Sequence, residues 1–501
     1  MPKRAAGAIL TGLSLDRTQG TPLYRQLYDG LRDAILTQRL MPGERLPSTR
    51  TLAEELGVSR RTVVDAFLQL YAEGYLDGRI GAGTYVAQTL PDDFVKTDAV
   101  SAPPISESFS STPPLSRRFL AQRAHTDHVL AQFQTDKEQG RAFLLGTPAL
   151  DEFPNALWGR IAARIGRGTA AHADSYQHSA GHLPLREAVA AYLGGARGVR
   201  CRAEQVLIVA GAQQAISLIA HVLIDPGDSV WMEEPGYFGA KGALLGAGAH
   251  LVPVPVDGEG LDSAQGRRLA PNARLAFVTP SHQMPLGVTM SLPRRLALLE
   301  WARDANAWII EDDYDSEYRY ASRPLAALQS LDTHERVIYM GTFSKVLFPS
   351  LRLGYIVAPP NLVDPLTAAR RLMDSHSPLR DQLILTEFMR EGHFERHIRR
   401  MRALYHERQS ILLEAARREL AGILDIAPAD GGMHLVGYLP PGTDDRQAAL
   451  EAKRQGVRAQ ALSYNYLEAP ERSGLVLGYA AASPAEIIAG IRGLATALRR
   501  R

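Results

Sequence analysis

Three short stretches in the first ninety residues carry apolar side chains at helical spacing. They span residues 22–36, 51–56 and 60–71, and an apolar residue at every third or fourth position is typical of a helix with one buried face. Gly57 separates the second stretch from the third, and Ser59 stands where a side chain caps the start of a helix. The pattern therefore predicts three helices, of which the last two form a helix-turn-helix.

A small hairpin, or wing, is expected after these helices, because residues 75–76 and 81–86 are short strand-like runs with glycine between them. In a helix-turn-helix the N-terminal residues of the second helix enter the major groove, where arginine hydrogen-bonds guanine edges and phosphates. A plain helical domain would show the same spacing, so the pattern alone leaves both interpretations open. The residues at that helix start are Ser59, Arg60, Arg61 and Thr62.

The rest of the chain first loses this periodicity and then shows a different one. Residues 89–139 are rich in proline and serine, which predicts an extended linker between a domain of residues 16–88 and one of residues 140–501. In the second domain, strand and helix patterns alternate, which predicts an α/β fold with a mainly parallel sheet. A smaller C-terminal lobe is expected to begin after about Asp374.

Composition narrows the functional classes. The 501 residues are 45% hydrophobic, which is enough for more than one core. A net charge of +2 means that DNA binding needs a local basic patch rather than bulk charge. The single cysteine, Cys201, excludes an internal disulfide. The most apolar segment, residues 206–224, contains two glutamines and a histidine, so we interpret it as a strand and a buried helix rather than a membrane span. A cytoplasmic protein without membrane contact is expected.

Candidate chemistry concentrates around Lys345. This lysine follows Thr342 and Ser344, and Arg352 lies seven residues beyond it. A buried lysine with a lowered pKa is a nucleophile that forms imines with aldehydes, and an arginine fork binds phosphate. Most lysines are solvated surface charges, so Lys345 alone would mean little. Together with these neighbours it matches what a pyridoxal phosphate site needs.

A second segment supplies a partner for the ring of such a cofactor. Residues 308–314 predict a buried strand that ends in acidic residues. Asp312 can pair with a protonated pyridine nitrogen, and Tyr314 can hydrogen-bond the phenolic oxygen of the ring. At the start of another expected helix, free backbone amides can cradle a phosphate. The residues at that start are Gly211, Ala212 and Gln213.

Two parts of the chain resemble a known family. Residues 42–76 resemble the winged helix-turn-helix of GntR-type regulators; their sequence is PGERLPSTRTLAEELGVSRRTVVDAFLQLYAEGYL. Residues 309–320 and 339–355 resemble the aminotransferase-like domain of the MocR group of these regulators. Their sequences are IIEDDYDSEYRY and YMGTFSKVLFPSLRLGY. The resemblance implies a fold-type I pyridoxal-phosphate-dependent transferase domain, an operator in double-stranded DNA, a small-molecule effector and a homodimer. It also implies that Arg50 contacts DNA and that Gly81 or Gly83 forms the wing tip.

In the large domain the resemblance assigns further roles. Lys345 would hold pyridoxal phosphate as an internal aldimine, and Tyr237 would stack on the pyridine ring rather than serve only as a core residue. Tyr176 would reach the phosphate bound by the partner subunit. Aminotransferases carry an asparagine before a Pro-x-Gly turn, and here either His282 or Gln283 would take its role as a polar contact to the ring oxygen. No metal site is expected.

One position departs from the pattern of transaminases. Val476 stands where they carry an arginine that binds the substrate carboxylate, and a carboxylate beside valine would be left uncompensated. Either another arginine takes this role, or the ligand is not a usual α-amino acid. Pyridoxal phosphate itself is one candidate, which would fit a regulator of vitamin B6 synthesis. The arginines without an assigned place are Arg319, Arg380 and Arg458.

Three functions therefore compete. A pyridoxal-phosphate-dependent DNA-binding regulator that senses a small amine, or the cofactor itself, accounts for both the helix-turn-helix and Lys345. A working aminotransferase with an accessory N-terminal domain is the alternative; it retains the residues for partial reactions, but Val476 counts against full turnover. A DNA-binding protein with an inactive cofactor fold is disfavoured, because Lys345 and Asp312 are both present.

Overall fold

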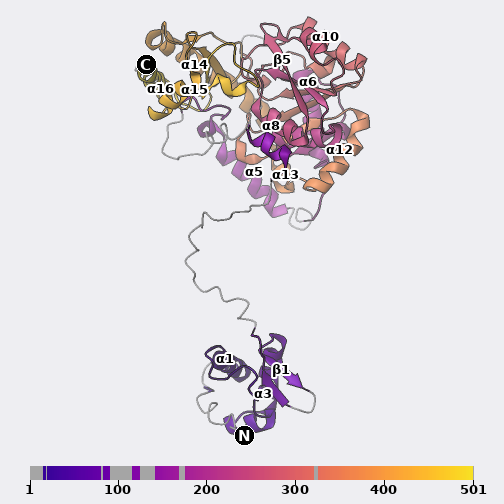
Figure 1. The fold of residues 1–501 in the computed structure, drawn as a ribbon, viewed down its shortest axis with the longest axis vertical. Helices are drawn as coiled ribbons and strands as arrows, with labels where there is room; N and C mark the ends of the chain where they lie inside the picture. Colours follow the sequence, from indigo (N-terminus) through magenta and orange to yellow (C-terminus); the bar gives the residue numbers. More distant parts are fainter. Residues whose placement is uncertain are drawn as a thin grey trace. The chain divides into compact units, whose positions relative to one another are not determined.

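The computed structural model describes residues 15–17, 20–79, 83–90, 115–124, 142–168, 175–320 and 325–499. The chain divides into two compact units, residues 1–113 and 114–501 (Figure 1). Most of the expected linker lies outside the described residues, but residues 117–124 are helical and belong to the second unit. Within the described ranges, no helix combines the length and the apolar character needed to cross a membrane.

The first unit contains the predicted helix-turn-helix. Gly57, in the left-handed conformation, ends its first helix, and the side chain of Ser59 accepts a hydrogen bond from the backbone of Thr62 at the start of its second helix. Leu31, Phe67 and other apolar residues at helical spacing form one buried core. The helices are α1 (Leu23–Leu36), α2 (Thr49–Leu56) and α3 (Arg60–Ala72).

The expected wing is an antiparallel hairpin of β1 (Leu76–Arg79) and β2 (Gly83–Val86). The segment before α2 extends it, because the backbone N–H of Leu46 donates to the carbonyl oxygen of Thr84 at 2.9 Å. Gly81, one of the two expected wing-tip residues, lies outside the described residues. Gly83 is the first residue of β2.

The second unit is organised around a mainly parallel sheet of eight strands. The strand order is β3-β10-β9-β8-β7-β4-β5-β6, and the pairs from β9 through β8, β7 and β4 to β5 are parallel, whereas β10 is antiparallel to both of its neighbours. The carboxyl ends of the parallel strands therefore meet along one edge. The strands are β3 (Val206–Val209), β4 (Ser229–Glu234), β5 (His250–Asp257), β6 (Gly260–Leu261), β7 (Leu275–Val278), β8 (Trp308–Asp313), β9 (Val337–Thr342) and β10 (Gly354–Val357).

Helices cover both faces of this sheet, since successive strand residues point to opposite sides and both sides are apolar. Ile310 and Met340 face one helical layer, formed by α7 (Ala212–Leu223), α8 (Phe238–Ala247) and α12 (Pro360–Met373). Ile309 and Tyr339 face the other side. The helices packed there are α5 (Asn155–Gly168), α6 (Leu183–Arg197), α10 (Leu292–Asp304), α11 (Leu328–Leu331) and α13 (Leu379–Arg390), with the short α9 (Ser263–Leu269) beside them.

The smaller lobe begins later than expected and also takes residues from much earlier in the chain. Leu385 and Phe388 of α13 and Phe394 of α14 (His393–Glu419) pack on the large sheet. The lobe therefore starts within α14, where Met401 enters the lobe core, rather than after Asp374. Phe143 is part of the lobe core and pairs with Gly478. The other elements are an antiparallel sheet of order β11-β12-β14-β13 and two helices: β11 (Asp425–Ile426), β12 (His434–Tyr438), β13 (Gln460–Ala461), β14 (Gly474–Gly478), α15 (Asp445–Arg454) and α16 (Pro484–Arg499).

Candidate functional site

A cavity of about 200 Å³ opens where the carboxyl ends of the parallel strands meet the smaller lobe. The large sheet contributes residues at or just beyond the ends of β4, β7, β8 and β9, and the lobe contributes the start of β12. Crevices at this edge of a parallel sheet are where ligands bind in such folds. The lining residues are Leu145, Gly146, Ala212, Tyr237, Phe238, Thr279, Met284, Asp312, Tyr314, Thr342, Lys345, Met433 and His434.

Lys345 reaches across the cavity to the lobe. Its Nζ donates a hydrogen bond of 2.8 Å to the carbonyl oxygen of Gly146. Gly146 has φ +68, and a Cβ built there would lie 2.5 Å from this Nζ, so a larger residue would strain the backbone and push the lysine amine from this position. Burial lowers the pKa of the Lys345 amine, although the carboxylates of Asp315 and Asp312 oppose this shift. A larger share of neutral amine makes Lys345 a better nucleophile.

Asp312 presents an unsatisfied carboxyl to the same cavity. It lies on β8, and its Oδ1 has no hydrogen-bond partner among the described residues. Burial, together with the charges of Asp313 and Asp315, raises the pKa of Asp312 to about 8, although Lys345 lowers it. A buried acceptor without a partner is unfavourable, and a positively charged N–H donor in the cavity would satisfy it. The carboxyl of Asp312 therefore fits a protonated pyridine ring.

The other end of the candidate site suits an anion. Gly211 stands at the start of α7, and a Cβ built on it would lie 3.7 Å from Nη1 of Arg352. The exposed Arg352 therefore faces the free backbone amides of the helix start. Thr342 and Ser344 are buried nearby, and the Thr342 hydroxyl accepts a hydrogen bond of 3.2 Å from the Ser344 backbone. A phosphate fits this combination of arginine, hydroxyls and amides.

Two tyrosines border the ring position. Tyr314 follows β8, and its hydroxyl lies 3.0 Å from Nδ1 of His282. Tyr237 follows β4 and also lines the cavity. Burial raises the pKa of both hydroxyls, so both stay protonated and able to donate at neutral pH.

The turn that was expected to supply a polar contact places a different residue at the cavity. Gln283 is buried, and its Nε2 donates to the carboxylate of Glu233 at 3.1 Å and to the carbonyl oxygen of Pro235 at 2.8 Å. Neither Gln283 nor His282 lines the cavity, whereas Met284 does. Met284 directly precedes Pro285 and so occupies the place of the aminotransferase asparagine. The turn therefore presents an apolar side chain, and His282 lies behind two lining residues, Tyr314 and His434.

Other expected residues lie outside the cavity. Gln213 donates through Nε2 to the carbonyl oxygen of Gly239 at 3.0 Å. Tyr176 is 90% exposed, with its ring edge-on to His376. Val476 is 0% exposed at the centre of β14 and packs with Val436 and Leu462.

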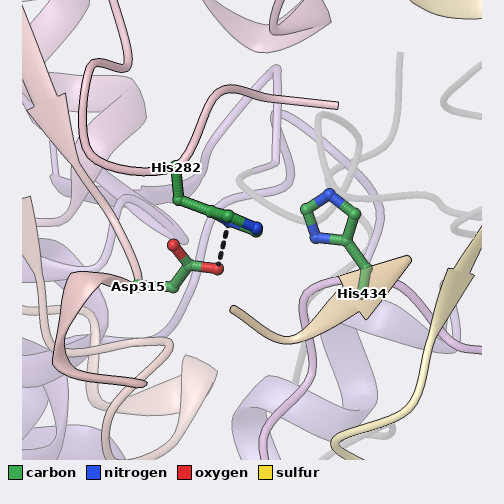
Figure 2. A group of neighbouring side chains, drawn as sticks. All are labelled: His282, Asp315 and His434. Carbon is green, nitrogen blue, oxygen red and sulfur yellow. Dashed lines mark ion pairs between the residues drawn. The ribbon is translucent and has the colours of Figure 1, made fainter. Parts of the chain in front are cut away.

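Two polar residues near the cavity were missed by the sequence interpretation, and Figure 2 shows them beside His282. Asp315 Oδ2 lies 3.1 Å from Nδ1 of His282. His434 enters from β12, and its Nε2 donates to the carbonyl oxygen of Pro285 at 2.9 Å. Burial, and next the charge of His282, lower the pKa of His434 to about 4, so this imidazole is neutral. The sequence could have indicated Asp315, because it stands three residues after Asp312. No sequence pattern around His434 indicated that it would lie at the site.

The DNA-binding candidates lie at the starts of two helices in the first unit. Arg50 pairs with Glu54 at 3.2 Å and Arg61 with Asp65 at 3.8 Å, and all four side chains are exposed. Arg60 Nε lies 3.4 Å from the Thr49 hydroxyl. Exposed pairs of this kind are weak, so these arginines are available to phosphates and bases.

Comparison with known proteins agrees with both halves of the chain. Residues 23–86 match the gntR family of bacterial regulatory proteins, and residues 152–488 match aminotransferase class I and II. The probable rhizopine catabolism regulatory protein MocR of Rhizobium meliloti is 43% identical over 486 residues, which cover 97% of this chain and 95% of that protein. The pyridoxine biosynthesis transcriptional regulator PdxR of Corynebacterium glutamicum is 31% identical over 470 residues, which cover 93% of this chain and 94% of that protein.

The large unit also resembles solved aminotransferases. The α-aminoadipate aminotransferase LysN of Thermus thermophilus, complexed with N-(5'-phosphopyridoxyl)-L-leucine, superposes with a TM-score of 0.68. It is 30% identical, and the match covers 74% of this chain and 96% of LysN. The chain belongs to the MocR subfamily of GntR-type transcriptional regulators, in which a helix-turn-helix is joined to an aminotransferase-like domain with pyridoxal phosphate as its cofactor.

Proposed function

We propose that the large domain uses pyridoxal phosphate held at Lys345 to sense a small amine, or further cofactor, and that this changes how the protein binds its operator. The observation that carries the proposal is the pairing, in one cavity, of an amine with a lowered pKa and an unpartnered carboxyl at Asp312. When bound, pyridoxal phosphate supplies an aldehyde that primary amines attack and a ring that withdraws electrons.

The chain's own residues would hold and orient the group. Arg352 would bind the phosphate together with the amides at the start of α7 and the hydroxyls of Thr342 and Ser344. Asp312 would accept the ring N–H at its free Oδ1, and Tyr314 would donate to the ring oxygen. Tyr237 would cover one face of the ring, as its place in the cavity wall allows.

DNA recognition would come from the exposed arginines of the first unit. Arg60 and Arg61 start α3, the helix expected to enter the major groove, with Arg50 beside them on α2. Ser59 and Thr62 hold the helix start through their mutual hydrogen bonds, and Gly83 would approach the adjacent backbone from the hairpin. Such contacts combine sequence reading with phosphate binding.

A homodimer would link sensing to DNA binding. The exposed Tyr176 supports this arrangement, because its phenol is available to a second subunit. The two helix-turn-helix domains of a dimer must match DNA half-sites about one helical turn or a multiple apart. A ligand shifts the equilibrium between two states of the dimer only if it binds them with different affinity. A protein acting on DNA in this way would work in the cytoplasm.

The relatives' names do not settle the effector. One relative is named for rhizopine catabolism and another for pyridoxine biosynthesis, so the regulated process differs between relatives. The alternative function, a working aminotransferase, has the lowered pKa of Lys345 in its favour. The buried Val476, in place of a carboxylate-binding arginine, weighs against it.

The test is footprinting of the purified protein on DNA from its own upstream region, with and without pyridoxal phosphate and a panel of amines. We expect cofactor and amine to change the protected pattern of the wild-type protein, and to leave that of Lys345→Ala unchanged. Identical footprints under all conditions would contradict sensing. Amine-dependent release of a keto product with steady turnover would instead favour the aminotransferase.

A further inference from the structure

The cavity wall beside Lys345 and Gly146 is built from apolar side chains. Leu145, Phe238, Met284 and Met433 line it. Leu145 also packs against the cluster of Val436, Leu462 and Val476, so a second apolar layer lies directly behind the first. A carboxylate held against this wall would lose its water without gaining a charged or hydrogen-bonding partner, which is unfavourable.

Within the described lining of the cavity, few side chains could compensate a carboxylate at this wall. Among the described lining residues, Lys345 and His434 are the basic side chains. His434 is neutral, with its pKa lowered to about 4, and its Nε2–H is used by the carbonyl oxygen of Pro285. Its remaining nitrogen, Nδ1, is therefore an acceptor and not a donor. Arg352 faces the start of α7, at the anion end of the site.

Two acidic side chains act on the lysine amine. Asp315 exerts the larger effect on Lys345 and Asp312 the next. Figure 2 shows the Asp315 carboxylate beside His282, with the ring of His434 opposite them. Asp315 Oδ2 lies 3.1 Å from Nδ1 of His282, whereas Asp315 Oδ1 and Nε2 of His282 lack hydrogen-bond partners among the described residues. This side of the site therefore attracts ammonium groups and hydrogen-bond donors and repels anions.

From these observations we propose that the effector is a primary amine without a carboxylate on its amine-bearing carbon. The apolar wall excludes that carboxylate, the Asp315 carboxylate attracts the ammonium, and the cluster of His282, Asp315 and His434 favours donors such as hydroxyl groups over acidic groups. This inference rests on the proposed function, because it assumes that the amine is sensed at Lys345.

Matched pairs of compounds that differ only in the carboxylate provide the test. We would titrate the full-length, cofactor-loaded protein with phenethylamine against L-phenylalanine, and with ethanolamine against L-serine, following the visible absorbance of the bound cofactor. Within a pair that responds, we expect the amine to bind at least about tenfold more tightly, since an uncompensated buried charge costs this much or more. Equal or tighter binding of the amino acids would overturn the inference.

Variants separate this inference from the proposed function. Val476→Arg should narrow or reverse the preference for the amines, whereas Leu450→Arg, which adds the same charge at a position 45% exposed on α15, should not change it. If Val476→Arg does not fold, the wild-type pairs still decide. A protein that captures no cofactor would refute the proposed function itself; one that captures cofactor and responds to no amine would overturn only this inference.

Discussion

Lys345 and Gly146 lie 199 positions apart in the chain, and the lysine amine donates a 2.8 Å hydrogen bond to the glycine carbonyl. The contact joins the large sheet to a segment whose neighbours pack in the smaller lobe. It holds the amine in the cavity opposite the start of β12, so a ligand that displaces Lys345 also releases a link between the two parts of the unit. Under the proposed function, this link would couple ligand binding at Lys345 to movement of the lobe.

Lys345, and not another buried lysine, should capture the cofactor. Lys241 is an internal control: it is 3% exposed and burial lowers its pKa as well, but its Nζ pairs with Glu234 at 3.1 Å and it does not line the cavity. After borohydride reduction with pyridoxal phosphate, peptide mass analysis should show the added mass at Lys345 and none at Lys241. Label at Lys241 of the folded protein would refute the assignment.

Gly146→Ala should weaken cofactor capture, because its Cβ would lie 2.5 Å from the Lys345 amine. Gly442 offers a matched control, since its φ is +79 but nothing lies within 4 Å of a Cβ built there. Both substitutions carry about 1 kcal/mol of backbone strain, so thermal unfolding should respond to each. Only Gly146→Ala should also lower the affinity for pyridoxal phosphate in an absorbance titration; an equal loss in both variants would contradict the contact.

The cofactor-free protein should lose stability as the pH rises. The pKa of Asp312 is raised to about 8 in the folded chain, above the value of about 4 for an unfolded carboxyl. The folded state therefore holds a proton that the unfolded state releases, and stability falls between these two values. Asp312→Asn removes this proton uptake. The melting temperature of the variant minus that of wild type should therefore be more positive at pH 8.5 than at pH 5.

The exposed Glu468 is a control for that measurement, because Glu468→Gln changes a carboxyl at the surface. We expect its melting temperature to follow wild type at both pH values. A constant difference between Asp312→Asn and wild type across the pH range would show that Asp312 does not titrate as described.

Arg352→Ala should separate recognition of the phosphate from recognition of the ring. Since Arg352 faces the amides at the start of α7, its loss should weaken pyridoxal phosphate binding by about 10- to 100-fold, as expected for a hydrogen bond to a charged group. Pyridoxal, which lacks the phosphate, should bind wild type and variant alike. A similar loss for both ligands would indicate that Arg352 supports the fold instead.

Arg60→Ala combined with Arg61→Ala should reduce operator binding by about 100-fold or more, because each lost base or phosphate contact costs about 1–3 kcal/mol. Arg25→Ala is the matched control, since Arg25 is an exposed arginine on α1, paired with Asp29 at 3.5 Å. Gel shifts at one fixed salt concentration would measure operator binding by wild type, the double variant and the Arg25→Ala control. An unchanged shift for the double variant would exclude the start of α3 as the reading surface.

The local sequence pattern was sufficient to predict the helices of the first unit and the residues at the centre of the candidate site. The helices of the first unit follow from apolar spacing and from Gly57 and Ser59 at their ends, because caps and periodicity act over three or four residues. Lys345 and Asp312 were identifiable for the same reason: each stands at the end of a strand pattern in a short string of characteristic residues. The same strings indicated the cofactor.

Tertiary structure decided what surrounds these residues. Which of His282, Gln283 and Met284 faces the cavity depends on the path of one turn and on the buried Glu233, which takes the Gln283 amide. His434 approaches Asp315 only because β12 of the lobe packs beside the large sheet. Contacts over such separations arise from packing of complete elements, and a periodic pattern carries no information about which elements meet.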